Sequence, residues 1–367
     1  MTDMKNQFCE RLLQLILRHW LLSLLLAYVL LAQSVPALGE HYARHLYPVV
    51  SYMLSFFPQW IPFSVSDLFV IGCIGLAVVF LIRLCFCPKR MLRLRRGIFF
   101  LTVLYTWFYI AWGLNYSQAT FFERTKTSPV EFNENDLQDF AIRYIRELNE
   151  AFLPDPAPLE AWELKQIGTD IQHLYQGCAM GMGIHAPHRT DLQAKTMLYT
   201  PLASMVGVTG SMAPFFCEFT LNGDLLPLQY PATYAHELSH YLGIAREAEA
   251  NFYAYQICTR STLPLVRYSG YMSLLPHVLS NARHLLDEKA YADLVDCIRP
   301  EVKAQYERQR QYWQAKYSET LGKWQDRMYN LYLKGNKIAS GRKNYSEVIG
   351  LLLSWEQAHV STSQSLH

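Results

Sequence analysis

The sequence predicts a mainly α protein in which N-terminal transmembrane helices are followed by an α+β domain with a small sheet. Hydrophobic residues make up 51% of the 367 residues and charged residues only 17%, whereas about 25% of a typical globular protein is charged. The shortage of charge is concentrated in the first third of the chain. Residues 117–367 instead combine helical periodicity with one short strand-like region, which indicates a globular domain.

Three apolar stretches in residues 1–116 are long enough to cross a bilayer, which takes about 20 helical residues. They lie at about 20–39, 65–87 and 97–116. The first and third carry no charge, and the second carries only Asp67 near its start and Arg83 near its end. We therefore expect residues 1–116 to form a membrane domain with three transmembrane helices, although the first stretch also has the pattern of a cleaved signal sequence.

Basic residues set the predicted orientation. Five lysines and arginines lie between the second and third stretches, whereas the link between the first two holds only Arg44. The positive-inside rule places the N-terminus and the basic link in the cytoplasm. The prediction is a multi-pass protein of the cell membrane with an extracytoplasmic domain at residues 117–367. The proline-broken segment 46–66 is expected to lie along the outer membrane face or to form a re-entrant loop.

The basic link has a second interpretation, as a site for anionic lipids or nucleic acid. Its charges adjoin two predicted spans, which favours topological anchoring. A formal net charge of +2 also argues against nucleic acid as a partner of the chain. We therefore expect the lipid bilayer to be a partner of the chain, and we expect no nucleic-acid partner.

Within residues 117–367, apolar spacing of three and four predicts helices at 137–152, 230–260, 301–334 and 345–355. Short strands and turns are expected at 197–222, where glycine, proline and β-branched or aromatic residues alternate. The apolar stripe of the 301–334 helix is expected to pack in the core, the alternative being a platform for carbohydrate or peptide. The stripe consists of Tyr306, Trp313, Tyr317, Leu321, Trp324, Met328 and Leu331.

The segment His236-Glu237-Leu-Ser-His240 is the motif that carries chemistry. Helix positions four apart share a face, so His236 and His240 are placed to present two imidazole nitrogens to one zinc ion. Glu237 is expected beside the ion as the catalytic residue, where a carboxylate accepts a proton from water. Zinc in a catalytic site takes a third protein ligand and leaves the fourth place open.

Glu247 is the preferred third ligand. On a straight helix Glu247 would lie about 10 Å beyond His240, which is too far for a metal–oxygen bond near 2 Å. The helix must therefore break, and Gly243 permits the reversal. Asn251, one turn after Glu247, is expected to orient a ligating histidine. Glu249 remains the alternative third ligand, less favoured because it has no such partner.

The combination of His236-Glu-Leu-Ser-His240 with Glu247-Ala-Glu-Ala-Asn251 resembles the gluzincin-type zinc metallopeptidases. In those enzymes the glutamate that opens the second motif is the third zinc ligand, and the Asp or Asn that ends it supports a histidine. The wider arrangement, with Tyr332-Leu333-Lys334 near the C-terminus, also resembles a family of bacterial membrane proteins of unassigned substrate. The resemblance implies a zincin-like metallopeptidase domain that binds one Zn²⁺. Here the spacing from His240 to Glu247 is shorter than in the best-known gluzincins.

The predicted function is hydrolysis of peptide bonds by a membrane-anchored zinc metallopeptidase, with a peptide or protein as substrate. The alternative is a non-catalytic membrane sensor or assembly protein with a structural or inactive zinc site. A transporter subunit is disfavoured because the predicted spans lack a charged residue at mid-membrane. No fingerprint of a P-loop, a dinucleotide site or a serine-hydrolase elbow supports another catalytic class.

Three further features are left open by the sequence. Tyr230, Tyr234 and Tyr253 are nearby candidates for stabilising an oxyanion. Residues 215–222 are either an edge strand that aligns a peptide substrate or a core strand. Four cysteines of the external domain are able to pair as disulfides in an oxidising compartment, namely Cys178, Cys217, Cys258 and Cys297.

Overall fold

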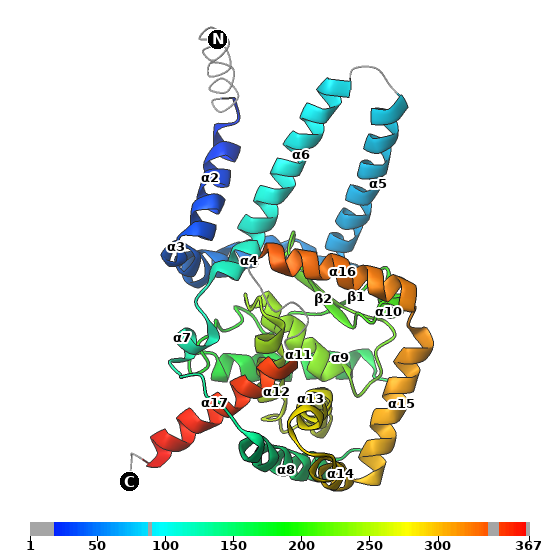
Figure 1. The fold of residues 1–367 in the computed structure, drawn as a ribbon. Helices are drawn as coiled ribbons and strands as arrows, with labels where there is room; N and C mark the ends of the chain where they lie inside the picture. The colour runs from blue at the N-terminus through cyan, green and yellow to red at the C-terminus, as the bar shows by residue number, and fades with distance from the viewer. Residues whose placement is uncertain (1–17, 87–89, 337–344, 365–367) are drawn as a thin grey trace.

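A computed structural model describes residues 18–86, 90–336 and 345–364. Three helices project as arms from one side of a mainly helical body that also holds a small sheet (Figure 1). The arms are α2 (Trp20–Ser34), α5 (Val65–Phe86) and α6 (Arg90–Ala111). A mainly α fold with one small sheet is therefore confirmed.

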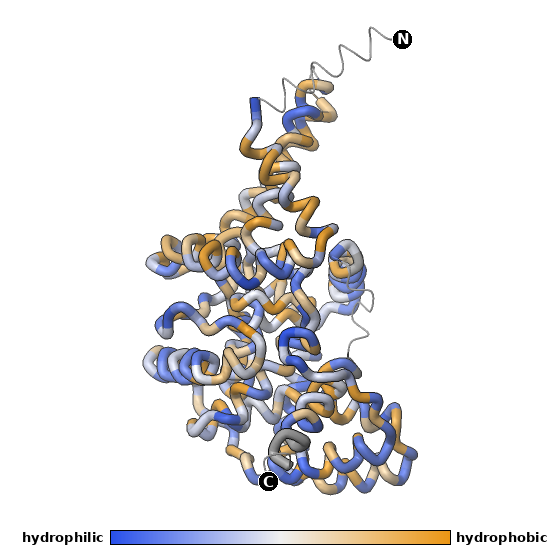
Figure 2. The backbone as a smooth tube through the Cα atoms, turned by 90° about the vertical axis from the view of Figure 1, so that its left-hand side faces the viewer, coloured by the Kyte–Doolittle hydropathy of each residue, from blue (hydrophilic) through white to orange (hydrophobic). Residues whose placement is uncertain are grey.

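The arms are strongly apolar (Figure 2). Among the described residues, α5 is the one helix long and apolar enough to cross a membrane. A second span results only if α2 and the segment Pro36–Trp60, bent by 112°, are counted as one. The third predicted span lies mostly in α6, which begins inside the basic link at Arg90 and is not among these candidates.

Prolines explain why the first arm ends early. The sequence predicts a span to about residue 39, but α2 ends at Ser34 and Pro36 opens the short helix α3 (Pro36–His41). Proline lacks an N–H and restricts the residue before it to extended conformations, as Val35 shows with φ −111° and ψ 104°. The chain then turns along the body through η1 (Tyr42–Leu46), α4 (Tyr47–Phe56) and η2 (Pro58–Trp60).

The sheet has three strands in the order β1-β3-β2. They are β1 (Lys195–Thr196), β2 (Gly210–Ala213) and β3 (Glu218–Leu221). β3 is central, parallel to β1 and antiparallel to β2, with Met212 opposite Phe219. All four residues of β3 are buried, so the core-strand interpretation of residues 215–222 is correct. β1 and β2 are therefore the two edge strands, and β2 is the edge strand that lies against Glu237.

Helices α11 (Tyr230–Tyr241), α12 (Glu247–Cys258) and α13 (Pro264–Leu285) form the centre of the body. They pack on one another, and α12 and α13 also pack on α17 (Tyr345–Gln364). The predicted helix at 137–152 is α8 (Glu134–Glu150), whose buried face includes Leu137, Phe140 and Tyr144 as the spacing indicates. The other helices of the body are η3 (Gly113–Ser117), α7 (Phe121–Thr125), α9 (Ala161–Cys178), α10 (Thr200–Met205) and α14 (Glu288–Asp296).

The prediction of one long helix at 301–334 is wrong. The chain forms α15 (Pro300–Lys316) and α16 (Glu319–Gly335), and Tyr317 between them is extended with ψ 134°. The two helices meet at a corner, and α16 runs across the body below α5 and α6 (Figure 1). The expected core stripe is wrong as well, because its α16 members Leu321, Trp324, Met328 and Leu331 are exposed.

The segments next to the arms are bonded to the body. Lys195 forms a buried ion pair with Glu218 and donates to the carbonyls of Pro58 (2.7 Å) and Phe63 (3.1 Å). The carboxylate of Asp67 accepts from the backbone N–H of Leu198 at 2.9 Å. One hydrophobic core contains residues on both sides of position 116, such as Trp112 and Phe121.

Candidate metal centre

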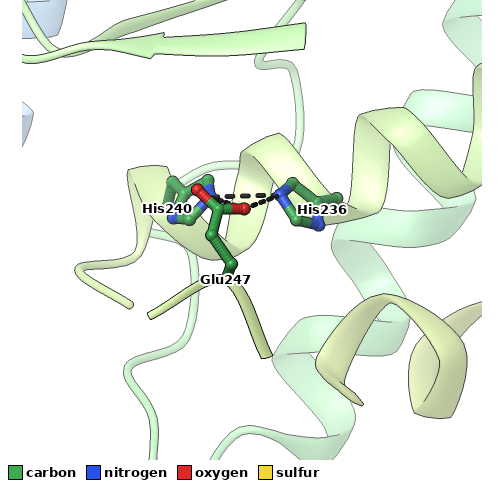
Figure 3. A group of neighbouring side chains, drawn as sticks. All are labelled: His236, His240 and Glu247. Atoms are coloured by element: carbon green, nitrogen blue, oxygen red, sulfur yellow. Dashed lines mark hydrogen bonds and ion pairs between the residues drawn. The ribbon is translucent and has the colours of Figure 1, made fainter. Parts of the chain in front are cut away.

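Two histidines and one glutamate converge between α11 and α12 (Figure 3). His236 Nε2 lies 3.1 Å from His240 Nε2 and 3.1 Å from Glu247 Oε2. His240 Nε2 lies 3.6 Å from the same carboxylate oxygen. Within the described ranges, no other group of three potential metal ligands is brought this close together.

The reversal between the two helices occurs at Gly243, as the sequence predicts. Gly243 has φ +94°, a conformation that L side chains rarely adopt. Its N–H bonds the His240 carbonyl at 3.0 Å, and the next N–H, of Ile244, bonds the Ser239 carbonyl at 3.0 Å. These bonds end α11 and turn the chain back, so that Glu247 becomes the first residue of α12.

Glu249, the alternative ligand, lies elsewhere. Its carboxylate forms an ion pair with Arg124, and both side chains are buried. Arg246 approaches the other oxygen at 3.6 Å. Glu249 therefore neutralises a buried guanidinium, and the acidic group that faces the two imidazoles belongs to Glu247.

Both histidine rings are oriented through their Nδ1 atoms. His236 Nδ1 lies 2.9 Å from Asn251 Oδ1, and His240 Nδ1 lies 2.6 Å from the carbonyl of Ile244. Because carbonyl oxygens accept hydrogen bonds, each Nδ1 atom carries a hydrogen, and in the neutral rings each Nε2 atom carries a lone pair. The two lone pairs then face each other and a carboxylate, an arrangement that is repulsive unless a positive charge lies between them.

The donor set fits zinc. Three ligands of a tetrahedral ion with bonds of about 2.0–2.1 Å lie about 3.3–3.4 Å apart, close to the observed 3.1, 3.1 and 3.6 Å. Two imidazoles and one carboxylate are also a ligand set found in catalytic zinc sites. A zinc ion here would be held by His236, His240 and Glu247.

Electrostatics in the cluster favours positive charge. Burial lowers the pKa of His240, but Glu247 and Glu237 outweigh this and raise it to about 9. Burial likewise raises the pKa of Glu247, but His240 and His236 outweigh it and hold that pKa well below its usual range. A cation between the three groups would take the place of this shared proton.

Tyr329 of α16 completes the surroundings of Glu247. Its hydroxyl donates a 2.5 Å hydrogen bond to Glu247 Oε1, the oxygen that does not face the histidines. Burial and the adjacent carboxylate raise the pKa of Tyr329, which keeps the phenol a donor. The sequence analysis missed this residue, because nothing local distinguishes it among 24 tyrosines.

Glu237 lies against the edge strand. Its side chain is buried, and Oε2 has no hydrogen-bond partner among the residues that the structure describes. Burial raises its pKa, opposed by His236, His240 and a backbone hydrogen bond from Met212. A Cβ added at Gly210 would lie 2.4–2.7 Å from the Glu237 carboxylate, so only glycine leaves room for it.

A cavity of about 1160 Å³ opens over the cluster. Its wall includes the three clustered residues, Glu237, the edge strand β2 and several residues of α16. None of the tyrosines proposed from sequence lines it. Tyr234 and Tyr253 instead donate to the carbonyls of Leu192 (2.7 Å) and Met182 (2.9 Å).

Residues next to the arms hold the end of α11. Trp112 Nε1 donates to the His240 carbonyl at 2.8 Å, and Tyr47 donates to the Tyr241 carbonyl at 2.6 Å. Gln118 donates to the Gly243 carbonyl at 2.7 Å. These bonds satisfy carbonyls that a helix end leaves without internal partners. The cluster is thus fixed partly by residues that follow or precede the arms.

The four cysteines considered for disulfides are all free. They lie on separate elements, with Cys217 and Cys258 buried and Cys297 exposed. Burial raises the pKa of both buried thiols. The possible pairing of these four residues is therefore not observed.

Fold and site define a mainly α protein with a His-His-Glu cluster in a cavity beside an edge strand. The profile of the family described as "Protein of unknown function (DUF3810)" matches residues 42–353. The chain belongs to this family, and the match includes every residue of the cluster. No curated protein and no solved structure matches the chain.

Proposed function

We propose that this chain is a membrane-anchored zinc metallopeptidase of the gluzincin type. The observation that carries the proposal is the convergence of His236 Nε2, His240 Nε2 and Glu247 Oε2, with both Nδ1 atoms held by oxygen acceptors. Glu237 supports catalysis rather than a purely structural site, because its unpartnered carboxylate oxygen adjoins the cluster and lines the same cavity. Only three potential ligands are grouped there among the described residues, which leaves a fourth position open.

A zinc ion, when bound, supplies a Lewis acid that makes water nucleophilic near neutral pH. Glu237 accepts the proton that water loses as its oxygen attacks the peptide carbonyl carbon. Glu237 then returns that proton to the amine as the C–N bond breaks. The raised pKa of Glu237 suits a group that both accepts and donates a proton.

The edge strand favours an extended polypeptide as substrate. β2 pairs with β3 on one side only, and Gly210, Ser211 and Met212 line the cavity on the other. An extended chain that adds to such an edge gains backbone hydrogen bonds without a sequence requirement. Its carbonyl would then lie beside Glu237, which packs on the same strand.

Anchoring in the cell membrane is the second part of the proposal. The most apolar 18 residues of α5 include none that is buried, and water-soluble proteins rarely expose so large an apolar surface. The basic residues at the tip of the α5–α6 pair favour a cytoplasmic N-terminus and an extracytoplasmic body. The topology is tested by placing a cysteine at an exposed body position (Trp162→Cys) and treating intact cells with a thiol reagent that does not cross the membrane. Protection of that cysteine from the reagent would contradict the proposed topology.

The decisive test of catalysis compares the purified protein with Glu237→Gln. We expect both to bind one zinc, and the variant to cleave a peptide library about 10²–10⁴-fold more slowly. Glu301→Gln is the matched control, because Glu301 is exposed and pairs only with Arg299 in the described chain. Equal cleavage by the wild type and Glu237→Gln would refute the enzymatic role. Bound zinc without any cleavage would favour the sensor or assembly protein.

A further inference from the structure

Helix α16 has an apolar face that the body does not cover. Four exposed apolar residues of this helix follow one another at sequence spacings of three, four and three, so they share one side of the helix. The exposed fraction of Trp324 is 64% and that of Leu331 is 65%. The stripe, hereafter the α16 stripe, consists of Leu321, Trp324, Met328 and Leu331.

The helix is fixed at the base of the arms. It crosses the body at the level where the body begins beneath α5 and α6 (Figure 1), and its C-terminal end is bonded to the end of α6. The Tyr109 hydroxyl donates to Asn336 Oδ1 at 2.9 Å, and the Tyr332 ring packs on Phe108 with centroids 6.2 Å apart. The α16 stripe therefore lies near the level at which the apolar arms enter the body.

A second exposed apolar surface lies on the α4–η2 segment, which also runs at the base of the arms (Figure 1). In the view of Figure 2, hydrophobic residues gather along the arms and at the level where the arms join the body. An apolar surface around the base of three apolar helices is what a body resting on a bilayer requires. The exposed residues of this second surface are Val49, Tyr52, Met53, Phe56, Phe57, Trp60 and Phe63.

We propose that α16 is an interfacial helix whose stripe is inserted in the surface of the bilayer that the arms enter. The inference rests on the membrane anchoring proposed above. The polar side of α16 carries Lys323 and Arg327. These residues suit a helix that lies among lipid headgroups, because long basic side chains reach water or phosphate. Trp324 suits the same location, because tryptophan is enriched at the interface between membrane and water.

The inserted helix also forms part of the cavity wall. Leu321 and Trp324, two of the four residues of the α16 stripe, line the cavity together with Tyr329 and Tyr332. Tyr329 also bonds the proposed ligand Glu247. The cavity therefore opens next to lipid, and its substrates are segments of polypeptides held close to the membrane surface. Soluble peptides reach the same cavity but are not held close to it by the membrane.

Photo-crosslinking in proteoliposomes of phosphatidylethanolamine and phosphatidylglycerol tests the lipid contact. Benzoylphenylalanine is placed at Trp324 or Met328, and lipid adducts are identified by mass spectrometry. Trp162 is the matched control, because it is a tryptophan of similar exposed fraction (66%) on α9 in the body. Ile74 on α5 is the positive control for the arms.

We expect lipid adducts at Ile74, Trp324 and Met328 and none at Trp162. Adducts at Ile74 without adducts at Trp324 and Met328 would overturn the proposal for α16 and leave the anchoring intact. Crosslinks from Trp324 and Met328 to a second copy of the chain, in place of lipid, would overturn it too. An absence of adducts at Ile74 as well would overturn the anchoring itself.

Discussion

The hydroxyl of Tyr329 donates a 2.5 Å hydrogen bond to Oε1 of Glu247, although the two residues are 82 positions apart in the sequence. The bond leaves Oε2 facing the imidazoles, 3.1 Å from Nε2 of His236. Because α16 carries Tyr329, the helix at the base of the arms directly contacts the acidic member of the cluster.

Tyr329→Phe removes the hydrogen bond and keeps the ring. We expect zinc affinity to fall by about 10-fold or more, because groups that orient a ligand typically contribute 10–100-fold. Competition with a chelating dye measures the affinity. Tyr306→Phe is a suitable control, since that ring also lines the cavity but belongs to α15. Unchanged affinity in Tyr329→Phe would show that the bond does not position Glu247.

Glu247→Gln and Glu249→Gln separate the two acidic candidates. Glu247→Gln is expected to lose bound zinc, together with the stability that the bound ion contributes. Glu249→Gln is expected to keep zinc but to lower the free energy of unfolding by about 3–5 kcal/mol, because it leaves Arg124 buried without its partner. Zinc content and denaturant unfolding provide the two readouts. Loss of zinc in Glu249→Gln alone would reverse the assignment.

Removal of metal should destabilise the body. A ligand that binds only the folded state stabilises it by about 2.7 kcal/mol at 100 times its Kd. We therefore expect the Tm to fall on treatment with a chelator and to recover with added zinc. His236→Ala serves as control, since its Tm should respond to neither treatment. A wild-type Tm that is insensitive to the chelator would argue against a bound ion.

Gly243→Ala should destabilise the reversal before α12. The residue has φ +94°, and an added Cβ would lie 3.1 Å from the Tyr47 ring and 3.2 Å from Asn115 Oδ1. Backbone strain of this kind costs about 1–3 kcal/mol. Thermal unfolding measures the loss, and Gly177→Ala, with open space around it, provides the comparison. Equal stability of the two variants would contradict the strain.

Gly210→Ala tests the fit between the edge strand and Glu237. The added methyl group would displace the carboxylate, whose atoms lie within 2.4–2.7 Å of the ideal Cβ position. We expect bound zinc to be retained while kcat falls at least about 10-fold, because general-base catalysis depends on position. Full activity in this variant would mean that Glu237 acts from another position or not at all.

The sequence by itself determined what depends on local geometry. A spacing of four puts His236 and His240 on one face of a helix, and the distance from His240 to Glu247 requires a bend, for which Gly243 is the local residue able to adopt positive φ. The choice of Glu247 with Asn251 follows from helical spacing in the same way. Helices such as α8 were predictable because their apolar residues repeat with the helical period.

Tertiary structure alone decided which distant groups meet. Tyr329, Gly210 and Trp112 reach the site from three other elements, and no periodicity in the sequence encodes such contacts. The same reason explains the failure at 301–334, where apolar spacing indicated a buried face. Periodicity reports that a face is apolar but not what covers it. Only the corner at Tyr317 and the position of α16 left that stripe exposed at the base of the arms.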